Sequence, residues 1–114
     1  MSLVPEAPRP RFVMSPDGLR LATYDFGDPD APAVIAVHGF ASGAVLNWHA
    51  SGWTRHLVRA GYRVLALDQR GHGASAKPHD PGAYSMDLLV ADVTTVIDTY
   101  LLDDVAFLGY SLGA

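Results

Sequence analysis

The sequence predicts an α/β fold with a doubly wound, mostly parallel sheet that begins with an antiparallel hairpin. Two β-rich runs near the N-terminus flank a turn sequence, and three later runs are apolar on both faces. Strands of the second kind are typical of parallel sheets covered by helices on both sides. Helical segments separate these runs, and this alternation is the order of α/β domains.

The hairpin is predicted over residues 11–27, after a flexible N-terminal arm at residues 1–10 that contains three prolines. Its turn, residues 15–18, has Pro at the second position and Gly at the fourth, as a type I turn prefers. The second run alternates between two faces, so that Leu21 and Thr23 point one way while Ala22 and Tyr24 point the other.

The three buried strands are predicted at residues 33–37, 62–67 and 105–108, with two helices between them. We expect Ser51 to cap the first helix and Gly61 to end it. Its buried face is expected to carry Trp53, Leu57 and Ala60.

Ser85 is expected to cap the second helix, with Asp87 in its first turn at the positive end of the dipole. The apolar spacing predicts a buried face that leaves the polar residue Asp92 mostly outside it. That face consists of Leu89, Val93, Val96, Ile97 and Tyr100.

Composition excludes several classes of protein. The net charge of −4 and the scattered basic residues argue against a nucleic-acid surface. No apolar run reaches the roughly 18 residues of a membrane span, and the N-terminus lacks a signal-peptide pattern, so we expect a cytoplasmic protein. There is no Cys, and His49, His56 and His79 lack acidic partners at metal-ligand spacing, so we expect no metal site.

All three buried strands end in a loop that contains Gly: HGF at residues 38–40, DQRGHG at residues 68–73 and GYSLG at residues 109–113. Ligands of open parallel sheets bind beyond the carboxyl ends of the strands. The chemistry of this protein is therefore expected where these loops meet.

GYSLG predicts a nucleophile at Ser111. A strand that turns sharply into a helix there forces a strained backbone and exposes the hydroxyl, and the flanking residues must be small. Gly109, Gly113 and Ala114 satisfy that requirement. The alternative is a plain turn, but the position directly after an apolar strand favours the nucleophile.

HGF predicts part of an oxyanion hole. The backbone N–H groups of Leu112, after the nucleophile, and of Phe40, after the flexible Gly39, are the candidate donors. Each such donor is typically worth about 3–4 kcal/mol of barrier. The alternative is a simple strand-end turn, and for His38 itself we favour a structural role that braces this loop.

Two further groups have open interpretations. Asp68 and His72 lie four residues apart and could complete a triad within the chain. In a tight glycine loop such groups more often bond the backbone, and Arg70 is available to neutralise Asp68. Tyr110 and Trp48 are candidates for lining an apolar pocket with Phe40, although ordinary core packing is an equally good interpretation of Trp48.

The three motifs, in this order at successive strand ends, resemble the α/β-hydrolase superfamily from about residue 11 to residue 114. The resemblance implies that Ser111 is the nucleophile and that the amides of Phe40 and Leu112 form the oxyanion hole. Residues 68–75 would be a structural loop near the pocket, and no metal or organic cofactor is needed. Ser111 stands at the sharp turn that holds the nucleophile, here called the elbow. A Ser there argues against the dehalogenase and epoxide-hydrolase branches, which carry Asp at that position.

In that superfamily the acid and the His of the triad follow the nucleophile. We therefore expect residues 11–114 to be the N-terminal half of a single core domain, truncated at the elbow and inactive alone. The strand at residues 105–108 would be an exposed apolar edge, so the C-terminal half is expected to be needed for stability.

The expected function is Ser-dependent hydrolysis of a small ester or related acyl compound through an acyl-enzyme. The same elbow also serves acyltransferases and C–C bond hydrolases. A non-catalytic ligand-binding module remains a further alternative, because fold does not determine function.

Overall fold

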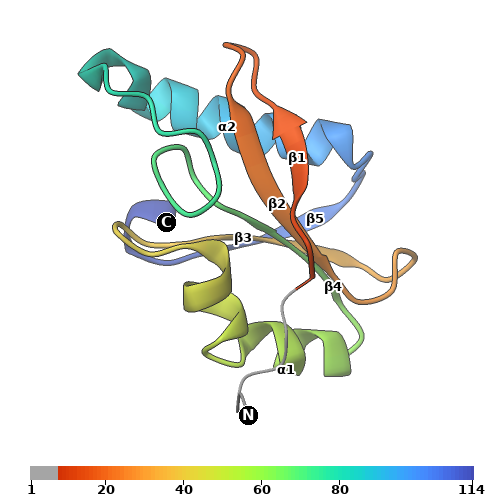
Figure 1. Cartoon of the computed structure of the whole chain (residues 1–114). Coiled ribbons are helices and arrows are strands. Elements are labelled where there is room, and N and C mark those ends of the chain that lie inside the picture. Colours follow the sequence, from red (N-terminus) through yellow and green to blue (C-terminus); the bar gives the residue numbers. More distant parts are fainter. Residues whose placement is uncertain (1–7) are drawn as a thin grey trace.

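A computed structural model describes residues 8–114 of the chain (Figure 1). Residues 1–7 of the expected N-terminal arm lie outside the described residues. Within the described part, five strands form one mixed sheet in the order β1-β2-β4-β3-β5. The strands are β1 Arg11–Met14, β2 Arg20–Phe26, β3 Ala33–Val37, β4 Arg63–Leu67 and β5 Val105–Gly109.

The predicted fold class is confirmed. Strand β1 pairs with β2 in antiparallel fashion, β2 pairs antiparallel with β4, and β3 pairs in parallel with both β4 and β5. The hairpin turn also follows its sequence pattern, because the Gly18 amide donates to the Ser15 carbonyl at 3.0 Å. Gly18 has a φ of +86°, a left-handed conformation that Gly adopts without steric cost.

One helix covers each face of the sheet: α1, Trp53–Arg59, and α2, Met86–Thr99, lie on opposite sides (Figure 1). Successive residues of one strand contribute to both cores, since Ile35 packs on the α2 side and Ala36 on the opposite side. This arrangement explains why β3 is apolar throughout. The core on the α2 side contains Leu21, Ile35, Leu67 and Val96, and the other contains Ala22, Tyr24, Ala36, Ala44, Trp48, Val64 and Ala66.

The predicted start of α1 is wrong. The Ser51 hydroxyl donates to backbone carbonyls of the π-helical turn Val45–His49, the nearer at 2.6 Å, so it completes the preceding turn. Gly52, with a φ of +94°, occupies the N-cap position of the helix instead. The helix buries Thr54 and leaves Trp53 50% exposed. Of the expected face, Leu57 packs against the core, whereas Ala60 is exposed.

The end of α1 follows the prediction. Gly61 has a φ of +97°, and its amide donates to the Val58 carbonyl at 3.0 Å. The Tyr62 amide donates to the Leu57 carbonyl, also at 3.0 Å. These two bonds form a Schellman motif, in which Gly supplies the left-handed residue after the helix.

Helix α2 is confirmed in its start and largely in its face. The Ser85 hydroxyl accepts a hydrogen bond from the Leu88 amide at 3.3 Å, and Val96 is buried against the sheet. Val93, Ile97 and Tyr100 pack around it. Asp92 contradicts the expectation, because it is 1% exposed and lies on the buried side, where it meets Arg70.

Strand β5 is the outermost strand of the described sheet next to β3, and its Phe107 side chain is 55% exposed. Neither helix described in residues 8–114 has the length and apolar character that a membrane crossing requires.

Candidate active site

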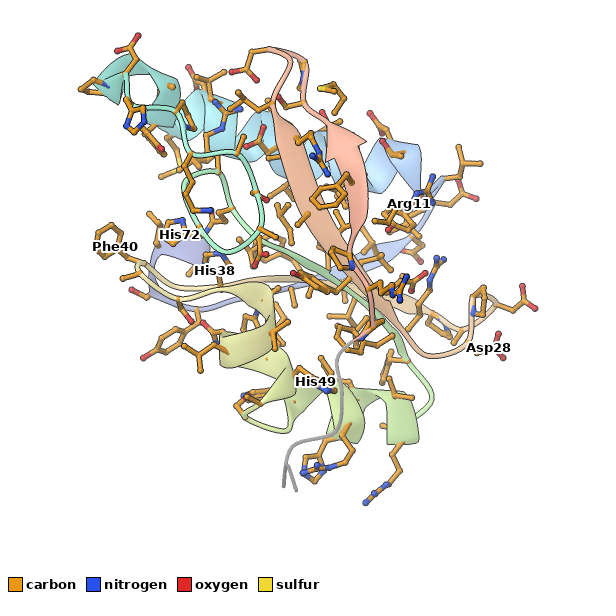
Figure 2. The ribbon with its side chains drawn as sticks, viewed as in Figure 1. Arg11, Asp28, His38, Phe40, His49 and His72 are labelled. Atoms are coloured by element: carbon orange, nitrogen blue, oxygen red, sulfur yellow. The ribbon has the colours of Figure 1, made fainter. Side chains whose placement is uncertain are left out.

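The loops after β3, β4 and β5 meet at one edge of the sheet. Figure 2 shows Phe40, His38 and His72 gathered there, far from Arg11 and Asp28. The loop after β3 lies directly against the loop after β5. A Cβ atom added to Gly39 would stand 3.0 Å from Cδ2 of Tyr110 and 3.4 Å from Cβ of Ser111.

Ser111 lies in the turn that follows β5. It begins a short 3₁₀ segment, Ser111–Gly113, and has a φ of +56°. A non-glycine residue rarely adopts this conformation, and such strain persists where surrounding structure enforces it. The side chain is exposed, and within residues 8–114 its hydroxyl takes part in no hydrogen bond. The turn therefore presents an unengaged hydroxyl at the surface.

Close packing surrounds the glycines of this turn. A Cβ on Gly113 would overlap the Val37 carbonyl oxygen and approach the His38 carbonyl oxygen to 2.8 Å. A Cβ on Gly109 would overlap the Gly113 carbonyl and stand 2.8 Å from the Phe107 ring. Both positions require Gly because backbone atoms occupy the space of a side chain.

Neighbouring amides of the loop after β3 are engaged on either side of Phe40. The Gly39 amide donates to Oδ1 of Asn47 at 3.0 Å, and the Ala41 amide donates to Nε2 of His72 at 3.1 Å. Among the described residues, the amides of Phe40 and Leu112 donate no hydrogen bond. The two amides that the sequence suggests as oxyanion donors are thus both free to bind a ligand.

His38 is fully buried and braces two loops. Its Nε2 accepts a hydrogen bond from the Gln69 amide at 3.0 Å, which leaves the ring proton on Nδ1 to donate to the Gly39 carbonyl at 2.7 Å. The Gln69 side-chain amide in turn donates to the His38 carbonyl at 2.8 Å. Burial lowers the pKa of His38, so the ring is held neutral.

The expectation that Arg70 neutralises Asp68 is wrong. One oxygen of the buried Asp68 carboxylate accepts from the Ala44 amide at 2.8 Å, and the other accepts from the Ala74 amide at 3.0 Å. The Tyr24 hydroxyl also donates to it at 3.1 Å, and burial together with this carboxylate raises the pKa of Tyr24 to about 12. Asp68 therefore joins the loops after β3 and β4 through backbone amides.

No triad forms within the described residues. His72 uses Nε2 to bind the Ala41 amide, and its Nδ1 lies 3.1 Å from the Arg70 carbonyl. No hydrogen bond joins Asp68 to His72 in residues 8–114. The backbone-binding interpretation of this loop therefore describes the structure better than the alternative of an internal triad.

Arg70 uses all five of its N–H groups in a buried network that sequence reasoning missed. It makes two hydrogen bonds of 2.7 Å to Asp92, two of 2.9 Å to Asp17 and one of 2.8 Å to the Ala83 carbonyl. Its hydrogen bonds, followed by that of Ser15, lower the pKa of Asp17 to about 2. The available signal was the spacing of Asp92, one helical turn before the buried Val96.

The two aromatic pocket candidates lie apart. Tyr110 is 62% exposed, and its ring lies where a side chain on Gly39 would project. Trp48 is buried in the core on the side away from α2 and meets the edge of Trp53, with ring centroids 6.4 Å apart. Neither side chain belongs to the wall of the cavity described next.

A cavity of about 620 Å³ opens between the loops after β3 and β4 and the start of α2. Leu112, the residue after Ser111, contributes to its wall. Other residues of the wall are Phe40, His72, Tyr84 and Leu89. The mostly apolar side chains suit a small organic ligand. Residues 8–114 contain no group of three His, Asp or Glu side chains placed to hold a metal ion.

Comparison with known proteins gives matches over most of the chain. The family model described as alpha/beta hydrolase fold matches residues 32–114. Epoxide hydrolase A of Mycobacterium tuberculosis is 38% identical over 112 residues, which are 95% of this chain and 32% of that protein. The non-heme chloroperoxidase of Burkholderia pyrrocinia is 33% identical over 107 residues, which are 90% of this chain and 35% of that protein.

Solved structures also match most of this chain. An esterase from Exiguobacterium antarcticum superposes with a TM-score of 0.78 at 27% identity, covering 90% of this chain and 35% of the esterase. The chain thus spans about a third of the length of the relatives it matches.

Proposed function

This chain belongs to the α/β-hydrolase fold family, and from that premise we propose that the complete protein is a serine hydrolase of small esters or related acyl compounds. One observation carries the proposal. Ser111 stands at a sharp strand end with a φ of +56° and an unengaged hydroxyl, and the free amides of Phe40 and Leu112 belong to the two adjoining loops.

The identity of the nucleophile favours acyl substrates over epoxides, although epoxide hydrolases are among the relatives. If Ser111 opened an epoxide, its oxygen would form an ether, which water does not cleave. If it attacks an acyl carbonyl, it forms an ester that water can hydrolyse. The likeness to a solved esterase is consistent with this choice.

In the proposed mechanism, Oγ of Ser111 attacks the substrate carbonyl carbon while a general base takes the hydroxyl proton. The carbonyl oxygen becomes an oxyanion that accepts hydrogen bonds from the amides of Phe40 and Leu112. The intermediate then collapses, and the base returns its proton to the departing alcohol. Water attacks the acyl-enzyme by the same route, which releases the acid and restores Ser111.

We place the general base and the acid that orients it outside residues 8–114. His38 is buried between Gln69 and Gly39, and His72 binds the Ala41 amide, so both imidazoles near the elbow are already engaged. The cytoplasmic location and the absence of a nucleic-acid partner, both expected from the sequence, stay predictions.

Hydrolysis of a short-chain p-nitrophenyl ester by the complete protein tests this function. We expect turnover that Ser111→Ala lowers by at least about 1,000-fold, as removal of the nucleophile does in other serine hydrolases. Ser51→Ala is the matched control, because that hydroxyl only bonds a nearby turn. Equal activity in Ser111→Ala and the control would contradict the proposal.

A further inference from the structure

We propose that His72 is a positioning residue that sets the direction of the Phe40 amide in the oxyanion hole. The inference rests on the proposed function, because it assigns a role in the same site. It starts from the hydrogen bond of 3.1 Å between the Ala41 amide and Nε2 of His72. This bond joins the loop after β3, which carries the free amide, to the loop after β4.

Two successive peptide groups determine where the Phe40 amide points. The first, Gly39–Phe40, carries that N–H, and its carbonyl accepts from Nδ1 of His38 at 2.7 Å and from the Ser42 amide at 3.3 Å. The second, Phe40–Ala41, is held through its N–H by His72. Each peptide group is planar, so rotation at Phe40 is the freedom that remains between them. With both groups held, the Phe40 amide has one direction.

The second peptide group needs such a hold because of its backbone conformation. Ala41 has a φ of +60°, in the left-handed region that Ala rarely adopts. The Phe40 side chain is 77% exposed and therefore does little to anchor the loop by burial. Within the loop, the Ser42 amide donates to the Gly39 carbonyl at 3.3 Å, and the hydrogen bond to His72 is the contact that ties this turn to the loop after β4.

The His72 ring is itself held in one orientation. Because Nε2 accepts from Ala41, the neutral ring carries its proton on Nδ1, which lies 3.1 Å from the Arg70 carbonyl. The ring meets His38 with centroids 4.8 Å apart and Phe40 with centroids 6.0 Å apart, both edge to face. Figure 2 shows these three side chains together at the end of the sheet.

The backbone at His72 is equally fixed. Its amide donates to the Gln69 carbonyl at 2.9 Å, and its carbonyl accepts from the Ser75 amide at 3.1 Å. Earlier in the same loop, Gln69 is bound to His38 and Arg70 to the buried carboxylate of Asp92. The imidazole therefore projects from a rigid support, as positioning of a catalytic group requires.

The test compares two substitutions in the complete protein. His72→Phe keeps an aromatic ring between His38 and Phe40 but has no acceptor for the Ala41 amide. His72→Gln places an amide oxygen at a reach similar to that of Nε2. We expect His72→Phe to lower kcat by about 10- to 100-fold with KM changed less than about threefold, and His72→Gln to stay within about fivefold of wild type, since loss of one oxyanion donor costs about 100- to 1,000-fold.

A thiono ester supplies a readout that a merely structural role would not move. Sulfur is a weaker acceptor than oxygen, so well-directed amides accelerate an oxo ester more than its thiono analogue. We expect His72→Phe to lower the ratio of oxo-ester to thiono-ester rates by at least about threefold, and His72→Gln to preserve it. If the His72→Phe protein does not fold, His72→Met replaces it. Met has a length similar to that of Gln but only a weak acceptor, so the comparison with His72→Gln is the same.

The outcomes separate this inference from the proposed function. If activity depends on Ser111 but His72→Phe keeps wild-type kcat, or loses kcat with an unchanged oxo-to-thiono ratio, the positioning role is wrong and the hydrolase proposal stands. If the Ser111→Ala variant keeps wild-type turnover, both the hydrolase proposal and the positioning role of His72 are wrong.

Discussion

Arg70 and Asp92 form a buried, two-pronged ion pair, with both hydrogen bonds at 2.7 Å and both side chains shielded from solvent. The pair fastens the loop after β4 to helix α2. Asp17, in the hairpin turn, accepts two further hydrogen bonds from the same guanidinium. Three segments distant in the sequence thus depend on one cation.

We expect Asp92→Asn to lower the free energy of unfolding of the complete protein by about 3–5 kcal/mol, because it leaves a buried guanidinium without its main partner. Urea denaturation measures this change. Asp25→Asn is the matched control, since Asp25 also accepts two hydrogen bonds from one guanidinium, that of Arg63 at 2.9 and 2.8 Å, but its side chain is 37% exposed. Such a pair is worth about 0–1 kcal/mol, and equal losses in the two variants would contradict the assignment.

The lowered pKa of Asp17 predicts a specific acid dependence of stability. The folded pKa of Asp17 is about 2, whereas the pKa of an unfolded Asp is about 3.9, so the unfolded state binds more protons between these values. The contribution of Asp17 is therefore present above about pH 4 and lost as pH falls toward 2. Asp17→Asn should be less stable than wild type at neutral pH, and the difference should shrink in that window. A difference that stays constant with pH would argue against it.

The lowered pKa of His38 predicts that the free energy of unfolding also depends on pH in a higher range, near pH 6.5. Burial lowers its folded pKa, so below about pH 6.5 the unfolded state takes up a proton that the folded state resists. Stability should therefore fall as pH drops below that value. His38→Gln removes the titrating group, so its stability should change less over the same range. Parallel stability curves for the two proteins would exclude this contribution of His38.

Gly113→Ala tests the close packing of the elbow. The added Cβ would overlap the Val37 carbonyl oxygen, and we expect a loss of about 1–3 kcal/mol in the free energy of unfolding. Gly82→Ala is the control, because the nearest atom to its Cβ would be the Asp80 carboxylate at 3.4 Å, an ordinary contact. Thermal unfolding of both variants gives the comparison, and a neutral Gly113→Ala would contradict the packing described at Val37.

The sequence predicts most of this fold because its signals are local. The turn at residues 15–18, the helix start at Ser85 and the helix end at Gly61 each follow from a few adjacent residues. Strands apolar on both faces are also visible without tertiary information, and they indicate a covered parallel sheet.

What the sequence does not reveal depends on contacts between distant residues. Arg70 and Asp92 are 22 positions apart, and a charged helical residue such as Asp is expected to face solvent until a buried partner is known. Ser51 has the local pattern of a cap, but its hydroxyl has carbonyl partners in the preceding turn. The role proposed for His72 likewise depends on a loop 31 residues away.

Covalent labelling of the complete protein by a fluorophosphonate probe tests the central claim, that Ser111 is the nucleophile, most directly. Peptide mass spectrometry should find one adduct, on Ser111, and Ser111→Ala should abolish it while Ser51→Ala does not. An adduct on another residue with Ser111 unmodified, or undiminished labelling of Ser111→Ala, would contradict the account.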